Sequence, residues 1–189
     1  MSDLHRAVSS ESEELILVDI EDNEVGYRSK ADCHDGPGVL HRAFSLFLFN
    51  ENGELLLQQR SAEKRLWPGY WSNSCCSHPR RGETLSIATM RRLHDELNTA
   101  ADLEYVYQFC YQVEFSEAGS ENELCHVYLG RIDGAISPNE SEIADIRFVS
   151  ASELDGELAT QPQRFTPWFM QEWQALKESY AEQLARYAM

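Results

Sequence analysis

The chain of 189 residues is long enough for one globular domain and too short for two full hydrophobic cores. Apolar residues make up 42% and charged residues 25%, which excludes disordered and fibrous classes, and the longest apolar run, within residues 43–49, is too short to span a membrane. The net charge of −16 argues against a nucleic-acid partner, because such proteins use cations to displace the counterions of phosphate. Five cysteines without CxxC spacing, and no signal-peptide pattern, favour a reducing cytoplasmic setting.

The first part of the chain is predicted to form strands separated by loops. We expect residues 1–13 to be a flexible acidic tail and residues 14–189 to form one domain. Residues 15–20 predict a strand and residues 27–41 a loop. Residues 43–49 and 55–59 flank a turn rich in Asn and Gly, which indicates a hairpin. The connection over residues 61–83 has no regular pattern, and loops of that length are often functional.

The second part of the chain alternates between helix and strand. Apolar residues recur at helical spacing between Thr84, a plausible cap, and Asn98, a plausible stop. Residues 105–115, 124–132 and 147–149 predict strands, and residues 165–187 predict a final helix with Pro167 in its first turn. Strands interrupted by one helix and closed by another favour an α/β domain with a mixed sheet between helices.

Cations concentrate in one stretch of this acidic chain. Between Arg60 and Arg92 there are seven Lys and Arg residues against two acids, so this stretch carries +5 and the remainder −21. A basic segment in an acidic protein favours a small polyanionic ligand that is bound locally. Pairing of these cations with surface acids would explain the same pattern, and composition does not separate the two.

Histidine and carboxylate residues form a candidate set of metal ligands. His34 and His41 flank the first loop, and His78 follows the Cys-rich segment. Glu121 and Glu123 lie two residues apart at the start of a strand, where both side chains share a face. Imidazoles and carboxylates together suit Mn²⁺, Mg²⁺ or Fe²⁺. Each histidine could also be an ordinary loop or surface residue, so the metal site depends on whether the five groups converge.

Cys75 and Cys76 are the candidates for acid–base chemistry in the long loop. A free cysteine near a histidine or a metal can be a low-pKa thiolate that gives and takes a proton, although a buried inert cysteine and a strained vicinal disulfide are alternatives. Neighbouring side chains of an extended segment point to opposite faces. Cys76 is therefore expected on the face of His78, and Cys75 on the opposite face with Ser77.

Glu96 and Trp168 are candidates of a different kind. Glu96 lies near the C-terminal end of the predicted helix, where its charge opposes the helix dipole, so it needs either an arginine or a metal ion nearby. Trp168 begins the last helix, where an indole face can stabilise a cation. Core packing is the alternative for Trp168, as it is for Tyr111.

Together these residues resemble the type I isopentenyl-diphosphate isomerases, a branch of the Nudix fold, over roughly residues 14–175. The resemblance rests on Asn73 to Pro79, Glu121 to Glu123, Arg91-Arg92-Leu93 with Glu96-Leu97, Trp67-Pro68-Gly69 and Phe165-x-Pro167-Trp168. It implies an α/β fold with a Nudix-like mixed β-sheet sandwiched between helices in a single domain.

The Nudix hydrolase signature fits this chain only in part. Its opening glycine, one metal-binding glutamate and its closing glycine fall on Ser77, Arg92 and Asn98. Loss of the glutamate removes an oxygen ligand for Mg²⁺, and arginine supplies a phosphate contact instead. The resemblance therefore implies a helix of the Nudix type without the hydrolytic chemistry.

The resemblance also implies an activity and a set of roles. The reaction interconverts isopentenyl and dimethylallyl diphosphate in isoprenoid biosynthesis, by protonation and deprotonation through a tertiary carbocation. The implied catalytic residues are Cys76, Glu123 and Tyr111, with Trp168 stabilising the cation. The implied ligands of a first metal (Mn²⁺, Mg²⁺ or Zn²⁺) are His34, His41, His78, Glu121 and Glu123, and Glu96 would hold a second Mg²⁺. The implied diphosphate contacts are Lys30, Arg60, Lys64, Arg92 and Ser77.

Two other functions compete with this reading. One is a Nudix hydrolase of a prenyl or nucleoside diphosphate, and the other is a non-catalytic module that binds diphosphate through a metal. The expected partner in each case is a small molecule, without nucleic acid or membrane. The isomerase is expected to act as a cytoplasmic monomer.

Overall fold

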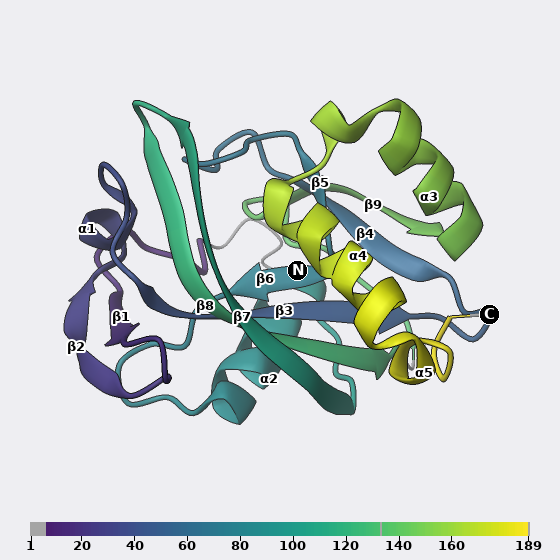
Figure 1. Ribbon diagram of the computed structural model, residues 1–189, viewed down its shortest axis with the longest axis horizontal. Helices are drawn as coiled ribbons and strands as arrows, with labels where there is room; N and C mark the ends of the chain where they lie inside the picture. The colour runs from purple at the N-terminus through teal and green to yellow at the C-terminus, as the bar shows by residue number, and fades with distance from the viewer. Residues whose placement is uncertain (1–6, 133, 189) are drawn as a thin grey trace.

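The computed structural model describes residues 7–132 and 134–188, and within these ranges the strands form one mixed sheet (Figure 1). The strands are β1 (Glu14–Val18), β2 (Glu24–Ser29), β3 (His41–Phe49), β4 (Leu55–Arg60), β5 (Trp71–Ser72), β6 (Cys75–Ser77), β7 (Leu103–Ser116), β8 (Gly119–Arg131) and β9 (Ile143–Val149). The helices are α1 (Lys30–His34), α2 (Leu85–Leu97), α3 (Ala151–Thr160), α4 (Pro167–Ser179) and α5 (Ala181–Leu184), with a short 3₁₀ turn at Pro162–Arg164.

Strand β3 lies at the centre of the sheet. It pairs in parallel with β8 along its whole length, and antiparallel with β1, β6 and β4 at successive points on its other side. Its side chains alternate between two cores: Phe47 and Phe49 pack with α3 and α4, whereas Phe44 and Leu46 pack with α2. Figure 1 shows α2 and α4 on different sides of β3. The predicted mixed sheet between helices is confirmed.

The two clearest local signals in the sequence form as predicted. Strands β3 and β4 make a hairpin whose turn is held by Asn50, which accepts hydrogen bonds from the backbone N–H groups of Asn52 and Glu54, while Gly53 takes a φ of +72°. Helix α2 starts at Thr84, whose side chain caps the N–H of Ile87. It ends at Asn98 in the left-handed conformation. These boundaries depend on contacts within a few residues, which is why the sequence reveals them.

Several predicted boundaries are wrong where pairing or packing comes from distant residues. Residues 27–41 are not all loop, because they include the end of β2 and helix α1. The connection 61–83 contains β5 and β6, which pair with β4 and β3. The last helix is interrupted at Tyr180 and continues as α5, and helix α3 was not predicted although Ser150 and Glu153 form a capping box.

The expected N-terminal tail can be described only in part. Residues 1–6 lie outside the described residues, whereas residues 7–13 lie against the domain. The carbonyl of Val8 accepts a hydrogen bond from Arg92 at 3.1 Å, and the carbonyl of Glu13 accepts one from the N–H of Lys30 at 2.8 Å. Residues 7–13 therefore contact the domain through hydrogen bonds to α1 and α2. No helix within the described ranges has the length and apolar character needed to cross a membrane.

Candidate active site

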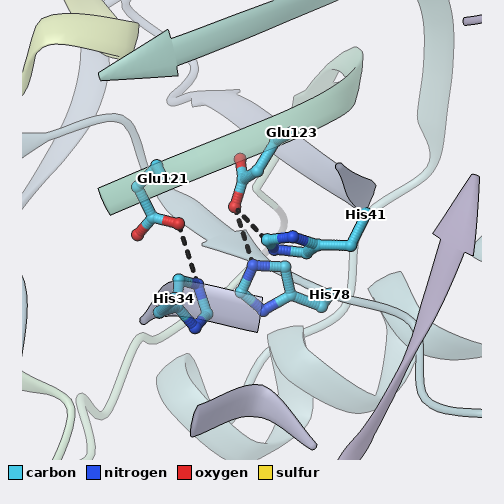
Figure 2. Close-up of side chains that lie close together, drawn as sticks. All are labelled: His34, His41, His78, Glu121 and Glu123. Carbon is cyan, nitrogen blue, oxygen red and sulfur yellow. Dashed lines mark hydrogen bonds and ion pairs between the residues drawn. The ribbon is translucent and has the colours of Figure 1, made fainter. Parts of the chain in front are cut away.

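Four parts of the chain bring the five predicted metal ligands together at one end of the sheet. His34 ends α1, His41 begins β3, and His78 follows β6. Glu121 and Glu123 lie on β8, where the parallel register sets Glu123 opposite His41. One ligand atom from each of the five residues lies within 4.8 Å of all the others. Figure 2 shows the five side chains turned toward one another. The pairing of β3 with β8 therefore decides the convergence that spacing alone left open.

The imidazole rings are oriented by backbone carbonyls behind them. Nδ1 of His34 lies 2.7 Å from the carbonyl oxygen of Lys30, and Nδ1 of His41 lies 2.7 Å from that of Val39. When each Nδ1–H donates to its carbonyl, the unprotonated Nε2 faces the carboxylates. His34 Nε2 is 2.8 Å from Glu121 Oε2, and His78 Nε2 is 2.7 Å from Glu123 Oε1.

The donor set fits a divalent cation. His41 Nε2 is buried without a hydrogen-bond partner and lies 3.7 Å from Glu123 Oε1. Burial, followed by the nearby rings of His41 and His34, holds the pKa of His78 well below its ordinary value, so that this ring is neutral as a metal ligand must be. A cation at the centre would satisfy the orphaned nitrogen and balance the two carboxylates.

The cluster forms one wall of a cavity of about 200 Å³. The cavity has three kinds of wall: metal-ligand candidates, cations, and a group of apolar or weakly polar side chains. The cations are Lys30, Arg60, Lys64, Arg65 and Arg92, and the third wall includes Leu66, Cys76, Ser77, Tyr111 and Trp168. Among the predicted site residues, His41 and Glu96 do not line it.

The two adjacent cysteines face different surroundings. Cys76 lines the cavity, with its Sγ 3.9 Å from Arg60 Nη1. Cys75 is fully buried on the other side of β6, where its Sγ donates to Glu96 Oε1 at 3.4 Å. Burial raises the pKa of Cys76 to about 12, so the structure keeps a neutral thiol where the sequence suggested a low-pKa thiolate. Both cysteines are free.

Tyr111 and Glu123, which line the same cavity as the Cys76 thiol, form a short hydrogen-bonded pair. The Tyr111 hydroxyl donates to Glu123 Oε2 at 2.5 Å, which leaves Oε1 of Glu123 for the histidines. Burial, together with the charge of Glu123, raises the pKa of Tyr111 well above its ordinary value. The tyrosine is therefore a protonated phenol that is hydrogen-bonded directly to one of the candidate metal ligands.

Trp168 lies at the apolar wall with only 2% of its surface exposed. Its ring stacks near Tyr111 at 6.1 Å and meets Trp67 edge-on at 5.1 Å. The guanidinium of Arg60 lies 5.4 Å from the Trp168 ring centroid, within the range of a cation–π contact. The indole Nε1 is buried without a hydrogen-bond partner, so the ring contributes its face and bulk.

The basic stretch of the sequence divides into two groups. Arg60, Lys64, Arg65 and Arg92 line the cavity together with Lys30, whereas Arg80, Arg81 and Arg91 pair with Glu13, Glu14 and Glu83. Burial and the charge of Lys64 lower the pKa of Lys30, which reflects the crowding of cations at this wall. Pairing with surface acids is therefore confirmed for Arg80, Arg81 and Arg91. Binding of a polyanion stays a prediction for the cations that line the cavity.

Glu96 lies outside the five-residue cluster. Its Oε1 accepts from Arg92 Nε at 2.8 Å and lies 2.6 Å from Nη2 of the same guanidinium. Arg92 therefore places a cation beside Glu96, as the position near the C-terminal end of α2 requires. Arg92 is the residue that replaces a glutamate of the hydrolase signature.

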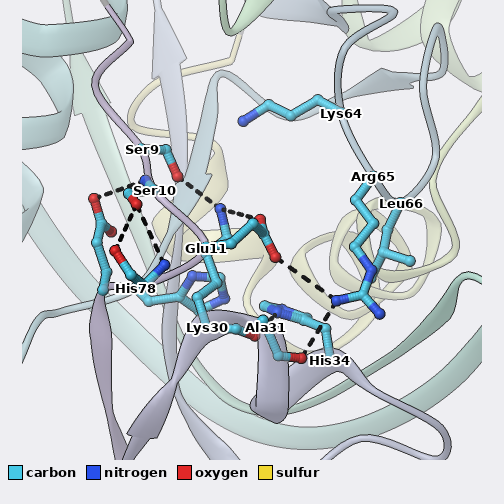
Figure 3. A network of polar contacts seen from close by, with 12 residues as sticks. Ser9, Ser10, Glu11, Lys30, Ala31, His34, Lys64, Arg65, Leu66 and His78 are labelled. Carbon is cyan, nitrogen blue, oxygen red and sulfur yellow. Dashed lines mark hydrogen bonds and ion pairs between the residues drawn. The ribbon is translucent and has the colours of Figure 1, made fainter.

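Residues that no motif had singled out complete the cavity. Figure 3 shows Ser9 and Glu11 of the N-terminal segment beside the cationic wall. Ser9 Oγ lies 2.6 Å from Lys30 Nζ, and Glu11 lies within 3.8 Å of both Lys30 and Arg65. Glu142, on the turn before β9, reaches the cavity between Lys64 and Arg92. No local pattern marks these acids, because only the fold brings them to the site.

Comparison with known proteins defines the class. Residues 39–169 match the NUDIX domain family. The DR0079 protein of Deinococcus radiodurans has a TM-score of 0.64 and 25% identity, over 79% of this chain and 90% of that one. The NUDIX domain of Shewanella oneidensis NrtR, solved with ADP ribose, has a TM-score of 0.56 at 15% identity over 75% of this chain and 87% of its own, and supports the fold alone. The family match and the structural matches both place this chain in the Nudix class.

The sequence relatives narrow the class. A protein of Photorhabdus laumondii named isopentenyl-diphosphate Delta-isomerase 1 is 39% identical over 91% of this chain and 99% of its own. Isopentenyl-diphosphate Delta-isomerases of Serratia proteamaculans and Burkholderia multivorans are 40% and 42% identical, over 93% and 83% of this chain and 98% and 89% of theirs. The chain belongs to the isopentenyl-diphosphate Delta-isomerase family within the Nudix fold.

Proposed function

We propose that this protein interconverts isopentenyl and dimethylallyl diphosphate by proton transfer at two carbons. The observation that carries the proposal is the arrangement of one cavity, in which the Tyr111–Glu123 pair and the Cys76 thiol line the same space as a wall of cations. A plain alkene is a very weak base, so its protonation needs a strong local acid and a stabilised cation. The cavity offers a group suited to each requirement.

The proton steps use the two sides of the cavity. Tyr111 and Glu123 deliver a proton to the terminal alkene carbon, which leaves a tertiary carbocation. Cys76, across the substrate, first passes its thiol proton to solvent and then, as the thiolate, takes the proton from the carbon next to the cationic centre. The double bond thus moves by one position and the substrate neither gains nor loses a proton overall, while Tyr111 and Glu123 regain their proton from solvent. The neutral state of the Cys76 thiol also allows it to donate in the reverse direction.

A divalent cation fits the first site, held by His34, His41, His78, Glu121 and Glu123. When bound, the ion supplies Lewis acidity that makes the proton of the Tyr111–Glu123 pair more acidic. Mixed nitrogen and oxygen ligands suit Mn²⁺ and Mg²⁺, with Zn²⁺ as a further candidate. Trp168 would place its ring against the carbocation, as it already does against the Arg60 guanidinium.

The cationic wall would bind the diphosphate. Lys30, Arg60, Lys64, Arg92 and Ser77 line it, and positive groups around a partly enclosed space are suited to phosphate oxygens. Glu96, on the far side of Arg92, would reach a second Mg²⁺ that accompanies the diphosphate. The proposal includes a cytoplasmic monomer, and the five unpaired cysteines agree with a reducing compartment.

One NMR experiment tests the activity. The protein is incubated with isopentenyl diphosphate and Mg²⁺ or Mn²⁺ in D₂O, and proton and phosphorus spectra are recorded. We expect conversion to dimethylallyl diphosphate with deuterium entering the product and the diphosphate intact. Release of phosphate would instead support the Nudix hydrolase, and an unchanged spectrum with bound substrate would support the non-catalytic module.

A further inference from the structure

Glu142 is an acid placed inside the cationic wall. Its side chain is only 5% exposed, and its Oε2 forms ion pairs with Lys64 and with Arg92 Nη2, the latter at 3.2 Å. Burial alone would raise the pKa of Glu142, but the charges of Lys64 and Arg92 lower it to about 2, so the carboxylate is ionised at neutral pH. A wall that binds an anion therefore contains a permanent negative charge.

Arg92 joins this carboxylate to a second one. The same nitrogen, Nη2, lies 2.6 Å from Glu96 Oε1 and 3.2 Å from Glu142 Oε2. Arg92 is itself 3% exposed, so water contributes little to screening these charges. The two carboxylates offset Lys64 and Arg92, and this part of the wall has no net formal charge.

The backbone holds Glu142 in this position from both sides. The N–H of Asn139 donates to the carbonyl of Glu96 at 2.8 Å, and the N–H of Glu142 donates to the carbonyl of Asn139 at 3.0 Å. On the other side, the N–H of Ser61 donates to the carbonyl of Glu142 at 2.9 Å. The turn that carries Glu142 is thus tied to the end of α2, which carries Glu96 and Arg92.

A bare diphosphate that entered this wall would meet the Glu142 carboxylate as well as the cations, and the charge of Arg92 would already be offset by Glu96 behind it. Repulsion between like charges is strong where solvent is excluded, and it is a common means of rejecting an unwanted ligand. A divalent ion on the diphosphate would reverse the effect, because Mg²⁺ is commonly held between one or two carboxylates and substrate phosphates.

We propose that Glu142 is a specificity residue, which makes the cationic wall accept diphosphate carrying a divalent cation and reject metal-free diphosphate. The inference rests on the proposed function for the identity of the ligand. In this proposal Glu142 takes no part in proton transfer. Its carboxylate decides whether the diphosphate binds with or without a divalent cation.

Binding of inorganic pyrophosphate tests this without any turnover. Its dissociation constant is measured by calorimetry with EDTA and again with excess Mg²⁺, and the gain from Mg²⁺ is the ratio of the two. For the wild type we expect a gain of about tenfold or more. For Glu142→Gln we expect tighter binding in EDTA and a gain reduced at least about fivefold, because the repulsion is removed.

Two further variants separate charge at this position from charge in general. Glu63→Gln removes the same charge from an exposed residue that also lines the cavity, and its gain should stay within about twofold of the wild type. Glu142→Asp retains the charge and should also keep most of the gain, which covers the case in which Glu142→Gln does not give a cooperative melt.

An unchanged gain in folded Glu142→Gln would overturn the proposal, as would an equal fall in Glu63→Gln or the absence of any Mg²⁺ gain in the wild type. These outcomes are independent of the NMR experiment. A protein that shows the expected pyrophosphate ratios without isomerising its substrate would contradict the proposed function and leave the role of Glu142 standing.

Discussion

Cys75 and Cys76 are neighbours in β6, and the alternation of a strand gives them opposite environments. Cys76 faces the cavity and Arg60, whereas Cys75 faces α2 and hydrogen bonds to Glu96. Ser77, the last residue of β6, was expected on the face of Cys75, but it lines the cavity together with Cys76 and His78, so the alternation does not extend past Cys76. Position in the strand decides which of the two thiols lines the cavity.

Replacement of each cysteine by serine tests this difference. Cys76→Ser keeps the shape but exchanges a thiol for a hydroxyl that barely ionises, so turnover should fall by about 10²–10⁴-fold. Cys75→Ser can still donate to Glu96 and should stay within about tenfold of the wild-type rate. Initial rates at saturating metal and substrate, with thermal melts, provide the comparison. Near-normal turnover in folded Cys76→Ser, or an inactive but folded Cys75→Ser, would contradict the assignment.

Trp168 allows a similar test of the cation–π contribution. Its Nε1 has no hydrogen-bond partner, so Trp168→Phe removes no polar contact and keeps a weaker aromatic face, whereas Trp168→Leu keeps only bulk. We expect turnover to fall more in the leucine variant, by about a further tenfold for each 1.4 kcal/mol of lost cation stabilisation. Equal losses in the two variants would mean that the residue acts through packing alone.

Helix α4 carries two side chains with different tasks. Trp168 lies in its first turn at the cavity, and Glu172, one turn later, is buried under the sheet where Cys125 donates to its Oε1 at 3.5 Å. Oε2 of Glu172 has no hydrogen-bond partner. Burial raises the pKa of Glu172 to about 8, against the ordinary value of 4.5. Helix α4 therefore packs against the sheet with the Glu172 side chain between them, and this carboxylic acid stays protonated at neutral pH.

This acid makes stability depend on pH in a defined direction. Between pH 4.5 and 8 the unfolded chain loses the Glu172 proton and the folded chain keeps it, so the free energy of unfolding should fall as pH rises, by up to about 1.4 kcal/mol per unit. Glu172→Gln is always neutral and should lose this slope. Urea titrations at pH 5.5, 6.5 and 7.5 measure it. A constant difference between Glu172→Gln and wild type would show that Glu172 is ionised in the folded protein.

For the molecule as a whole, the metal-ligand cluster draws together α1, β3, the segment after β6, and β8. These elements are separated by up to 89 positions between His34 and Glu123, yet the five donor atoms lie within 4.8 Å of one another. Carboxylates and rings buried so close together are stabilised by a cation, so metal binding should contribute to the stability of the fold as well as to activity.

Metal content measured by mass spectrometry tests the cluster. His34→Ala or Glu121→Gln should lower the number of metal ions bound per chain. His94→Ala should not, because the His94 side chain is 76% exposed and is not one of the five candidate ligands. Because the ligands must be unprotonated, occupancy should also fall below about pH 6. Full occupancy in His34→Ala, or full activity after exhaustive chelation, would contradict the site.

Local signals in the sequence determine the parts of the fold that form from neighbouring residues. The turn around Asn50, the cap at Thr84 and the stop at Asn98 were predicted because each depends on hydrogen bonds to residues two to four positions away. The motif from Asn73 to Pro79 likewise indicated the family, since it lies in one continuous stretch. Helix α3 was missed although its capping box is local, because its apolar pattern is weak and only Leu154 is buried.

The tertiary structure decides everything that depends on distant contacts. The parallel register of β3 with β8 sets His41 opposite Glu123. Burial, which sequence does not report, leaves Cys76 as a thiol instead of a thiolate. Glu142 enters the cationic wall only because its turn hydrogen bonds to the end of α2. A sequence determines which groups are available, but distances and desolvation set their charges and partners, and both arise only when the chain has folded.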